Sequence, residues 1–321
     1  MAKAEYMLSL IKAHFNNEDE HFLTIALQMA AHEAKLGHWK LAIEIKKIVD
    51  KFQKTRSTFK NNDLPSELDG LVIQTHPHAN LVDLIASANT KDKIRRVVFE
   101  YSRRDKLYSN DLKNRRKVLL TWHPWTGKTF TASIIASELG FPLSTILMEK
   151  LVTKFMGETS MKLRQVFDLI KSRPGVYLFD EFDAIGWERS RENDVWEMRR
   201  VLNSFLQFLE HDDSQSIIIA ITNNPKLLDQ ALFRRFDDII AYNLPTDEEK
   251  LLLLKNYLGR YNKQLDYKKI LPIINGLSHA EIALACTDSI KDMILWDLNI
   301  DETLVIKNIE DRNSAYHHKT I

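Results

Sequence analysis

The chain has 321 residues, of which 44% are hydrophobic and 28% are charged, so it can bury the core of about two domains. Its 45 Lys and Arg residues nearly balance 44 Asp and Glu residues, which argues against a protein that binds polyanions through its overall charge. The single cysteine, Cys286, excludes an intrachain disulfide framework and favours a reducing compartment. The sequence contains no apolar run long enough to span a membrane and no signal peptide, so we expect a cytoplasmic protein without membrane contact.

Residues 1–56 carry apolar side chains at helical spacing, among them Leu41, Ile45 and Val49. Gly37 suits the end of one helix and the turn to the next. We therefore expect an all-helical N-terminal module over residues 1–56. Asn, Pro and His residues then predict a linker over residues 57–80.

A basic segment follows, because residues 91–106 contain seven Lys or Arg residues. The favoured interpretation is a solvated helix face, since charged residues at helical spacing normally face water. Contact with nucleic acid is the alternative interpretation.

Short apolar runs then alternate with helical patterns. Residues 118–120, 176–179 and 217–221 indicate buried strands, each followed by a loop and a helix. This alternation is typical of an α/β fold with a parallel sheet, and from about residue 245 the chain is helical again. The expected helices cover residues 131–139, 161–170, 248–258 and 280–295.

The first chemical motif is Thr126-Gly127-Lys128-Thr129, which lies between a strand and a helix. In that position, backbone N–H groups at a helix N-terminus bind phosphate oxygens, and the lysine reaches the terminal phosphates. The threonine hydroxyl is a ligand for Mg²⁺.

The second motif is a pair of carboxylates, Asp180 and Glu181, directly after the strand 176–179. One carboxylate can hold Mg²⁺ and the other can polarise an attacking water. An acidic turn in solvent is the alternative, but the two motifs together, in this order, favour a machinery for nucleotide hydrolysis.

These motifs resemble those of the AAA+ ATPase family, in particular its protein-remodelling branch, over roughly residues 80–300. The resemblance implies a P-loop NTPase core of α/β class with a parallel sheet over residues 81–245. It also implies a small helical lid over residues 246–321, in addition to the N-terminal helical module.

The resemblance also implies roles for site residues. Asp180 and Thr129 would hold Mg²⁺, Glu181 would be the catalytic base, and Asn223 would help to orient the attacking water. Arg234 and Arg235 resemble arginine fingers that act on the neighbouring subunit, and because they are adjacent, the sequence leaves open which one does so. The implied ATP-binding residues are Trp122, His123, Pro124, Trp125, Thr126, Gly127, Lys128, Thr129 and Phe130.

The segment Phe155-Met156-Gly157 resembles the family's pore loop, in which an aromatic side chain grips an extended polypeptide. An ordinary core Phe-Met pair is the alternative. The resemblance implies a homo-oligomeric ring, expected to be a hexamer, that acts on a polypeptide with a separately encoded protease or adaptor. Nucleic acid is not expected as a partner. The N-terminal helices would recruit the substrate or the partner.

The lid segment 276–282 resembles the family's Gly-Phe-Ser-Gly-Ala-Asp-Leu sequence, and His279 stands at its second glycine. The sequence offers no convincing sensor-2 arginine.

Four tryptophans depart from the family pattern. Trp122 and Trp125 replace two glycines of the phosphate loop, where only glycine takes the required backbone angles cheaply. Trp187 and Trp196 also stand where relatives usually have small residues, and glycine occurs only 9 times in the chain. Three explanations compete: a pseudo-ATPase, an altered sequence, or UGA codons that mean glycine in some bacterial lineages but were read as tryptophan.

The sequence thus predicts an ATP-hydrolysing AAA+ protein that remodels, unfolds or translocates polypeptides, provided that Trp122 and Trp125 do not disable the loop. A binding scaffold without turnover and a nucleic-acid remodeller are the alternative functions.

Overall fold

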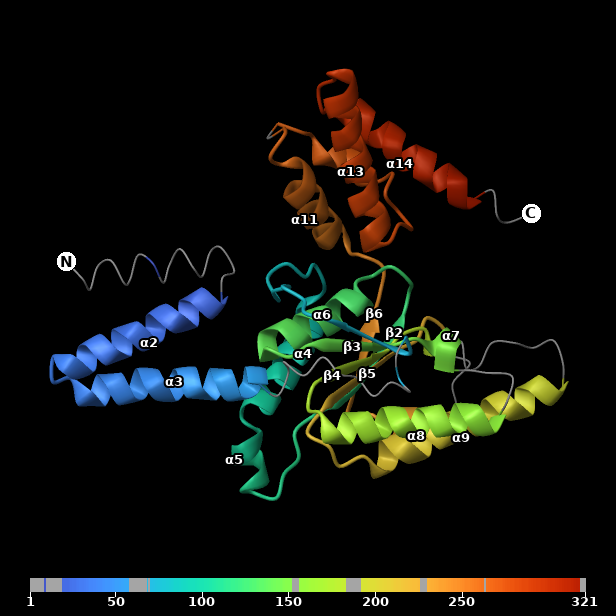
Figure 1. Cartoon of the computed structure of the whole chain (residues 1–321). Coiled ribbons are helices and arrows are strands. Elements are labelled where there is room, and N and C mark those ends of the chain that lie inside the picture. The colour runs from blue at the N-terminus through green and yellow to red at the C-terminus, as the bar shows by residue number, and fades with distance from the viewer. Residues whose placement is uncertain are drawn as a thin grey trace. The chain divides into compact units, whose positions relative to one another are not determined.

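The computed structural model describes residues 9, 19–57, 68, 70–151, 156–182, 192–225, 230–262 and 264–317. The chain divides into two compact units, residues 1–66 and 67–321 (Figure 1). None of the described helices is both long and apolar enough to cross a membrane.

The first unit contains two packed helices, α2 (Asp19–Lys35) and α3 (Trp39–Ser57). Leu23 and Ala26 of α2 and Val49 of α3 form the buried contact, with Ile45 packed against it. Gly37 has a φ of 86° between the helices, an angle that glycine adopts without a steric penalty. The predicted helices are present, whereas the predicted end of the module at residue 56 stays a prediction.

The second unit is built on a six-stranded sheet in the order β1-β3-β4-β5-β2-β6. Strand β1 runs antiparallel to β3, and all other neighbours are parallel. The expected strands are β2, β4 and β5. The predicted α/β class is confirmed, and the sheet is parallel as predicted except at the edge strand β1. The strands are β1 (Val72–Thr75), β2 (Lys117–Trp122), β3 (Leu143–Ile146), β4 (Val176–Phe179), β5 (Ile217–Ile221) and β6 (Asp238–Tyr242).

Helices cover both faces of this sheet, as Figure 1 shows. One face packs against α4 and α6 through buried aliphatic residues such as Ile94 and Ile135. The other face packs against α8 and α9 through an aromatic group, in which the Phe179 ring lies 5.0 Å from Phe205 and 6.0 Å from Phe167. The helices between β1 and β6 along the chain are α4 (Ala88–Ser102), α5 (Arg104–Tyr108), α6 (Lys128–Leu139), α7 (Met148–Leu151), α8 (Met156–Ser172), α9 (Glu192–His211) and α10 (Gln230–Phe233).

Strand β1 lies inside the segment 57–80 that the sequence predicts as linker. Its residues alternate in burial, and Ile73 is 46% exposed, because β1 is an edge strand with one face in solvent. The sequence does not predict this strand, because it has only four residues and the Asn, Pro and His residues around it are typical of loops.

The C-terminal part of this unit is a helical lid around its own apolar core, which includes Leu254, Ile282 and Val305. Two capping boxes begin its helices: Thr246 with Glu249, and Ser278 with Glu281. The lid helices are α11 (Asp247–Leu258), α12 (Tyr267–Ile270), α13 (His279–Trp296) and α14 (Glu302–His317).

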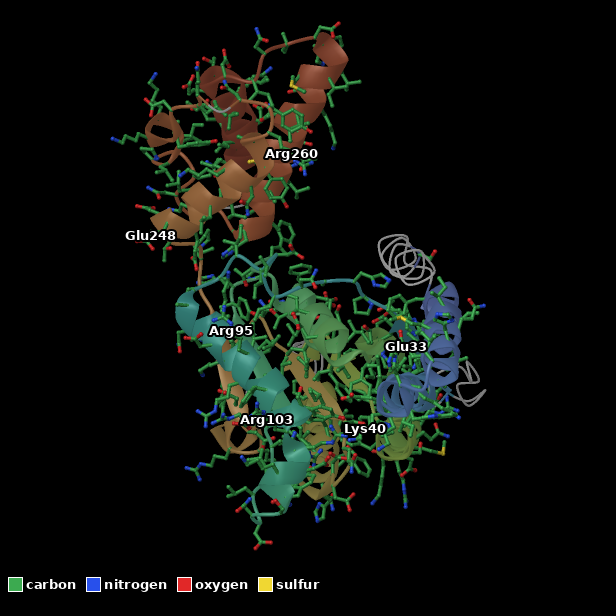
Figure 2. All side chains as sticks on the ribbon, turned by 90° about the vertical axis from the view of Figure 1, so that its left-hand side faces the viewer. Glu33, Lys40, Arg95, Arg103, Glu248 and Arg260 are labelled. Carbon is green, nitrogen blue, oxygen red and sulfur yellow. The ribbon has the colours of Figure 1, made fainter. Side chains whose placement is uncertain are left out.

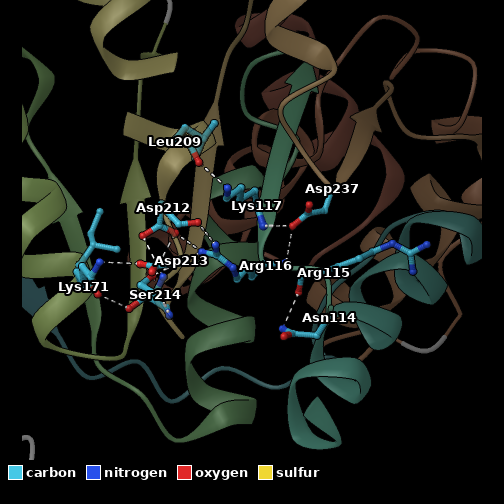
Figure 3. Close-up of polar contacts among 12 residues, drawn as sticks. Asn114, Arg115, Arg116, Lys117, Lys171, Leu209, Asp212, Asp213, Ser214 and Asp237 are labelled. Atoms are coloured by element: carbon cyan, nitrogen blue, oxygen red, sulfur yellow. Dashed lines mark hydrogen bonds and ion pairs between the residues drawn. The ribbon is translucent and has the colours of Figure 1, made fainter. Parts of the chain in front are cut away.

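A polar network fixes the start of β2, and Figure 3 shows its members. The buried Arg116 guanidinium donates to the Asp212 carboxylate and to the Asp212 backbone carbonyl. The Asp237 carboxylate accepts from the backbone N–H groups of Arg116 and Lys117, both at 2.9 Å. Lys117 Nζ donates to the Leu209 carbonyl, and burial lowers the pKa of this lysine. The network holds β2 in register, and β2 leads directly into the candidate site.

The basic segment predicted over 91–106 lies in α4 and α5, and Arg95 and Arg103 are labelled in Figure 2. Several of its charges are paired within the chain. Lys93 lies 3.0 Å from Asp238, Arg95 lies 2.8 Å from Asp92, and Arg96 lies 2.9 Å from Glu100. This pairing agrees with a solvated helix face.

Candidate active site

The site is organised by the loop that joins β2 to α6. Gly127 stands at the N-cap of α6 with a φ of 99°, and its carbonyl accepts from the Thr131 N–H at 2.9 Å. The N–H groups in the first turn of α6 are not used by the helix's own hydrogen bonds between residues i and i−4, and such groups at helix N-termini bind anions.

Two tryptophans of this loop hold left-handed backbone angles, with a φ of 78° at Trp122 and 60° at Trp125. A residue with a Cβ pays about 1–2 kcal/mol for this conformation. The side chains are 40% and 52% exposed, so much of each indole lies in solvent. The backbone thus has the shape that glycine normally provides, and its strain lies at the two positions where the sequence predicts it.

Lys128, the first residue of α6, is only 5% exposed. Its Nζ donates to the Trp122 carbonyl at 2.8 Å and also to the His123 carbonyl. The Thr126 hydroxyl donates to the same His123 carbonyl at 2.8 Å. The loop is therefore closed around a buried ammonium, which suits a site for an anion.

Thr129 and Asp180 meet beside this loop. The Thr129 hydroxyl donates to the Asp180 carboxylate at 3.1 Å, although they come from α6 and from the end of β4. Among the described residues, no group of three or more His, Cys, Asp or Glu side chains could hold a metal ion. A hydroxyl and one carboxylate fit Mg²⁺, which is typically bound by one or two carboxylates, water and phosphate oxygens.

Glu181 follows Asp180 with a φ of 52°, which is a strained angle for a glutamate. Its N–H donates to the Asp180 carboxylate at 2.9 Å, and its own side chain is exposed. Strained residues of this kind often lie at functional sites, where the surrounding structure holds them in place.

Strand β5 lies between β4 and β2 and ends at the same edge of the sheet. The buried Thr222 follows it and donates its N–H to the Leu120 carbonyl at 3.0 Å. Asn223, the next residue, is exposed. Because the carboxyl ends of parallel strands meet at one edge, Asn223 shares that edge with the loop, Asp180 and Glu181.

The two predicted arginines lie after α10 and differ in their surroundings. Arg235 Nε donates to the Glu210 carboxylate at 2.9 Å within the same chain. The Arg234 side chain is exposed.

A cavity of about 720 Å³ lies between the phosphate loop and the lid. Its walls are largely apolar, with Leu84, Phe130, Leu253 and Leu284 among them, and such a cavity has the size of a small-molecule site. The Ala280 N–H of α13 donates to the Trp125 carbonyl at 3.1 Å and so joins the lid to the loop. Sequence reasoning identified Trp125, Thr126, Gly127 and Phe130 of this lining, but no lid residue. The only sequence feature that pointed to the lid was the resemblance of segment 276–282 to the family's sequence.

Other predicted positions lie outside the described residues. Phe155 and Trp187 are among them, and of Met156, Gly157 and Trp196 only the helical backbone is described. The pore loop therefore stays a prediction.

Comparisons with known proteins identify relatives of this chain. The family model described as "ATPase family associated with various cellular activities (AAA)" matches residues 118–244. The AAA family ATPase y4kL of Sinorhizobium fredii is 32% identical over 300 residues, which cover 92% of this chain and 90% of the relative. A proteasome-activating nucleotidase of Methanococcus maripaludis is 33% identical over 180 residues, which cover 54% of this chain and 44% of the relative.

The crystal structure of the FIGL-1 AAA domain has the same fold. It matches with a TM-score of 0.61 and 22% identity, over 79% of this chain and 90% of that one. The match to the family model and the near full-length match to the Sinorhizobium protein show that the chain belongs to the AAA ATPase family.

Proposed function

We propose that this chain binds ATP with Mg²⁺, hydrolyses it to ADP and phosphate, and acts as a homo-oligomeric ring, a hexamer, that remodels polypeptides in the cytoplasm. The observation that carries the proposal is the arrangement of Lys128, Thr129 and Asp180. The buried ammonium and the hydroxyl–carboxylate pair lie together at the N-terminus of α6.

Each residue at this edge has a distinct task. The N–H groups of the loop and the Lys128 ammonium would bind the phosphates. Thr129 and Asp180 would hold Mg²⁺, which neutralises phosphate charge when bound. The exposed Glu181 carboxylate would take the proton of the attacking water, and Asn223 would orient that water.

Arg234 is the better candidate for the arginine finger. Arg235 is engaged by Glu210 of its own chain, whereas Arg234 is exposed and able to reach a neighbouring subunit. A guanidinium from that neighbour would neutralise charge that develops on the transferred phosphoryl group.

The mechanical part of the proposal depends on the family resemblance. Phe155 and Met156 would contact an extended polypeptide through apolar surface, without reading its sequence. The helices of residues 1–56 would recruit the substrate, an adaptor or a separate protease. One relative is named a proteasome-activating nucleotidase, which agrees with a partner of this kind.

The test measures ATP hydrolysis and unfolding of a folded reporter protein by the unaltered chain and by Glu181→Gln. We expect the variant to lose both activities and to keep ATP binding. Glu310→Gln is the matched control, because Glu310 is exposed on α14 in the lid. Equal hydrolysis by the unaltered chain and Glu181→Gln would refute the role of Glu181.

A scaffold that binds partners without turnover is the second candidate. The tryptophans at positions 122 and 125 favour it, because the left-handed angles that the loop adopts there cost a residue with a Cβ about 1–2 kcal/mol. It predicts no hydrolysis by the unaltered chain and no change in partner binding on Glu181→Gln.

A further inference from the structure

The side chain of His279 has no part in the proposed binding of phosphate or Mg²⁺, although it lies at the wall of the cavity between the loop and the lid. His279 is the first residue of α13, directly after the capping residue Ser278. Its neighbour Ala280 donates its N–H to the Trp125 carbonyl at 3.1 Å. His279 is therefore one residue away from the backbone hydrogen bond that joins α13 to the phosphate loop.

Both ring nitrogens of His279 are buried and have no hydrogen-bond partner among the described residues. A buried polar atom without a partner costs about 1–3 kcal/mol, so such atoms are rare and call for an explanation. The ring turns about two single bonds and lines a cavity, so a ligand there can supply the missing partner.

The charge state of the imidazole ring restricts which chemical groups it can bind. Burial lowers the pKa of His279, and the Glu249 carboxylate acts more weakly in the opposite direction. The imidazole is thus neutral at pH 7, with one N–H donor and one nitrogen acceptor. A neutral ring suits an uncharged base and not a phosphate group.

The rest of the cavity suits a flat aromatic ring. Leu84, Leu253 and Leu284 provide apolar surface, and the exposed aromatic rings of Phe130 and Tyr257 also line it. A purine base buries its faces against such surface and presents hydrogen-bonding groups only at its edges.

We propose that His279 is a base-contacting residue, which gives the adenine base of the bound nucleotide a hydrogen bond that a glycine at this position cannot give. The inference rests on the proposed ATP site and assigns it a side chain that recognises the base. His279 would then favour nucleotides over inorganic phosphates without touching the phosphates.

The test compares two probes, ATP and inorganic triphosphate, by calorimetry on the full chain with Mg²⁺. We expect His279→Ala to weaken ATP binding by about 3- to 10-fold, the effect of one net hydrogen bond, and to leave triphosphate binding unchanged. His279→Asn, which keeps a donor and an acceptor, should recover part of the ATP affinity. His211→Ala is the matched control, because His211 is exposed at the end of α9.

Three outcomes would overturn the proposal. Equal weakening of both probes by His279→Ala means that the ring only positions the lid, and unchanged affinity for both means that it does not contact the base. If the unaltered chain binds neither probe, the proposed ATP site itself is wrong, and the base contact is wrong with it.

Discussion

At the scale of single residues, Trp122 and Trp125 bear most directly on function. The loop keeps its shape, and both residues have the positive φ that glycine usually adopts, although they carry indole side chains. This agrees with a loop that is built for glycine. Peptide mass spectrometry of the protein from its native source separates the explanations, because glycine at both positions would identify a decoding error.

The backbone strain can be measured by comparing glycine and alanine at the same sites. Both double variants at positions 122 and 125 lose the indoles, but only glycine relieves the positive φ. We expect Trp122→Gly/Trp125→Gly to exceed Trp122→Ala/Trp125→Ala by about 1–2 kcal/mol in free energy of unfolding, measured in urea.

Trp296 provides the control, because it ends helix α13 and is not among the residues with positive φ. There the order should invert, with Trp296→Gly less stable than Trp296→Ala by about 0.5–1 kcal/mol. The same order at all three positions would contradict the strain.

The two arginines give a second prediction at this scale. Arg234→Ala should lower kcat by about 10³-fold or more with little change in ATP affinity, because a finger acts on the transition state. Arg235→Ala should have a smaller effect, since Arg235 is paired with Glu210. A larger loss of kcat in Arg235→Ala would reverse the assignment.

At the scale of elements, the network at the start of β2 makes a stability prediction. The paired side chains of Arg116 and Asp212 are 9% and 3% exposed, so Asp212→Ala leaves a buried guanidinium without its carboxylate. We expect a loss of about 3–5 kcal/mol in the free energy of unfolding, measured in urea.

The neighbouring Asp213 is a matched control, because it pairs with Lys171 at 2.9 Å on the open surface. Asp213→Ala should have little effect, since exposed ion pairs are weak. Similar losses in the two variants would show that the burial of Arg116 does not matter.

The sequence predicts the central strands better than the edge strands, and burial explains why. Strands β4 and β5 are buried at every position, so they form continuous apolar runs that stand out from their surroundings. Strand β1 is an edge strand with alternating burial. The interior strand β3 is missed for a different reason, because Ser144 and Thr145 interrupt its apolar residues. Of the lid helices, the sequence predicts α11 and α13, over residues 248–258 and 280–295, but it does not separately predict α12 or α14.

In the candidate site, too, the sequence predicts some residues and misses others. Lys128, Thr129, Asp180 and Glu181 follow strands in short motifs, so local sequence identifies them. The lid wall of the cavity, with His279 and Leu253, depends on how α11 and α13 pack against the loop, and no local pattern predicts such packing.

At the scale of the whole molecule, the proposed ring makes a mixing prediction. Glu181→Gln and Arg234→Ala subunits should each be inactive alone. Mixed rings should regain part of the ATP hydrolysis, because an Arg234→Ala subunit keeps its own Glu181 and receives the guanidinium from a Glu181→Gln neighbour. No recovery on mixing, with both variants shown to assemble together, would contradict a finger that acts between subunits.

The most direct test of the central claim, that the loop before α6 binds ATP, is calorimetric titration of the unaltered chain with ATP and Mg²⁺. We expect saturable binding that Lys128→Ala weakens by about 10- to 100-fold, the effect of a charge-assisted hydrogen bond. Lys307→Ala, on the exposed face of α14, should leave it unchanged. No binding by the unaltered chain, together with binding by Trp122→Gly/Trp125→Gly, would contradict the claim and show that the tryptophans disable the loop.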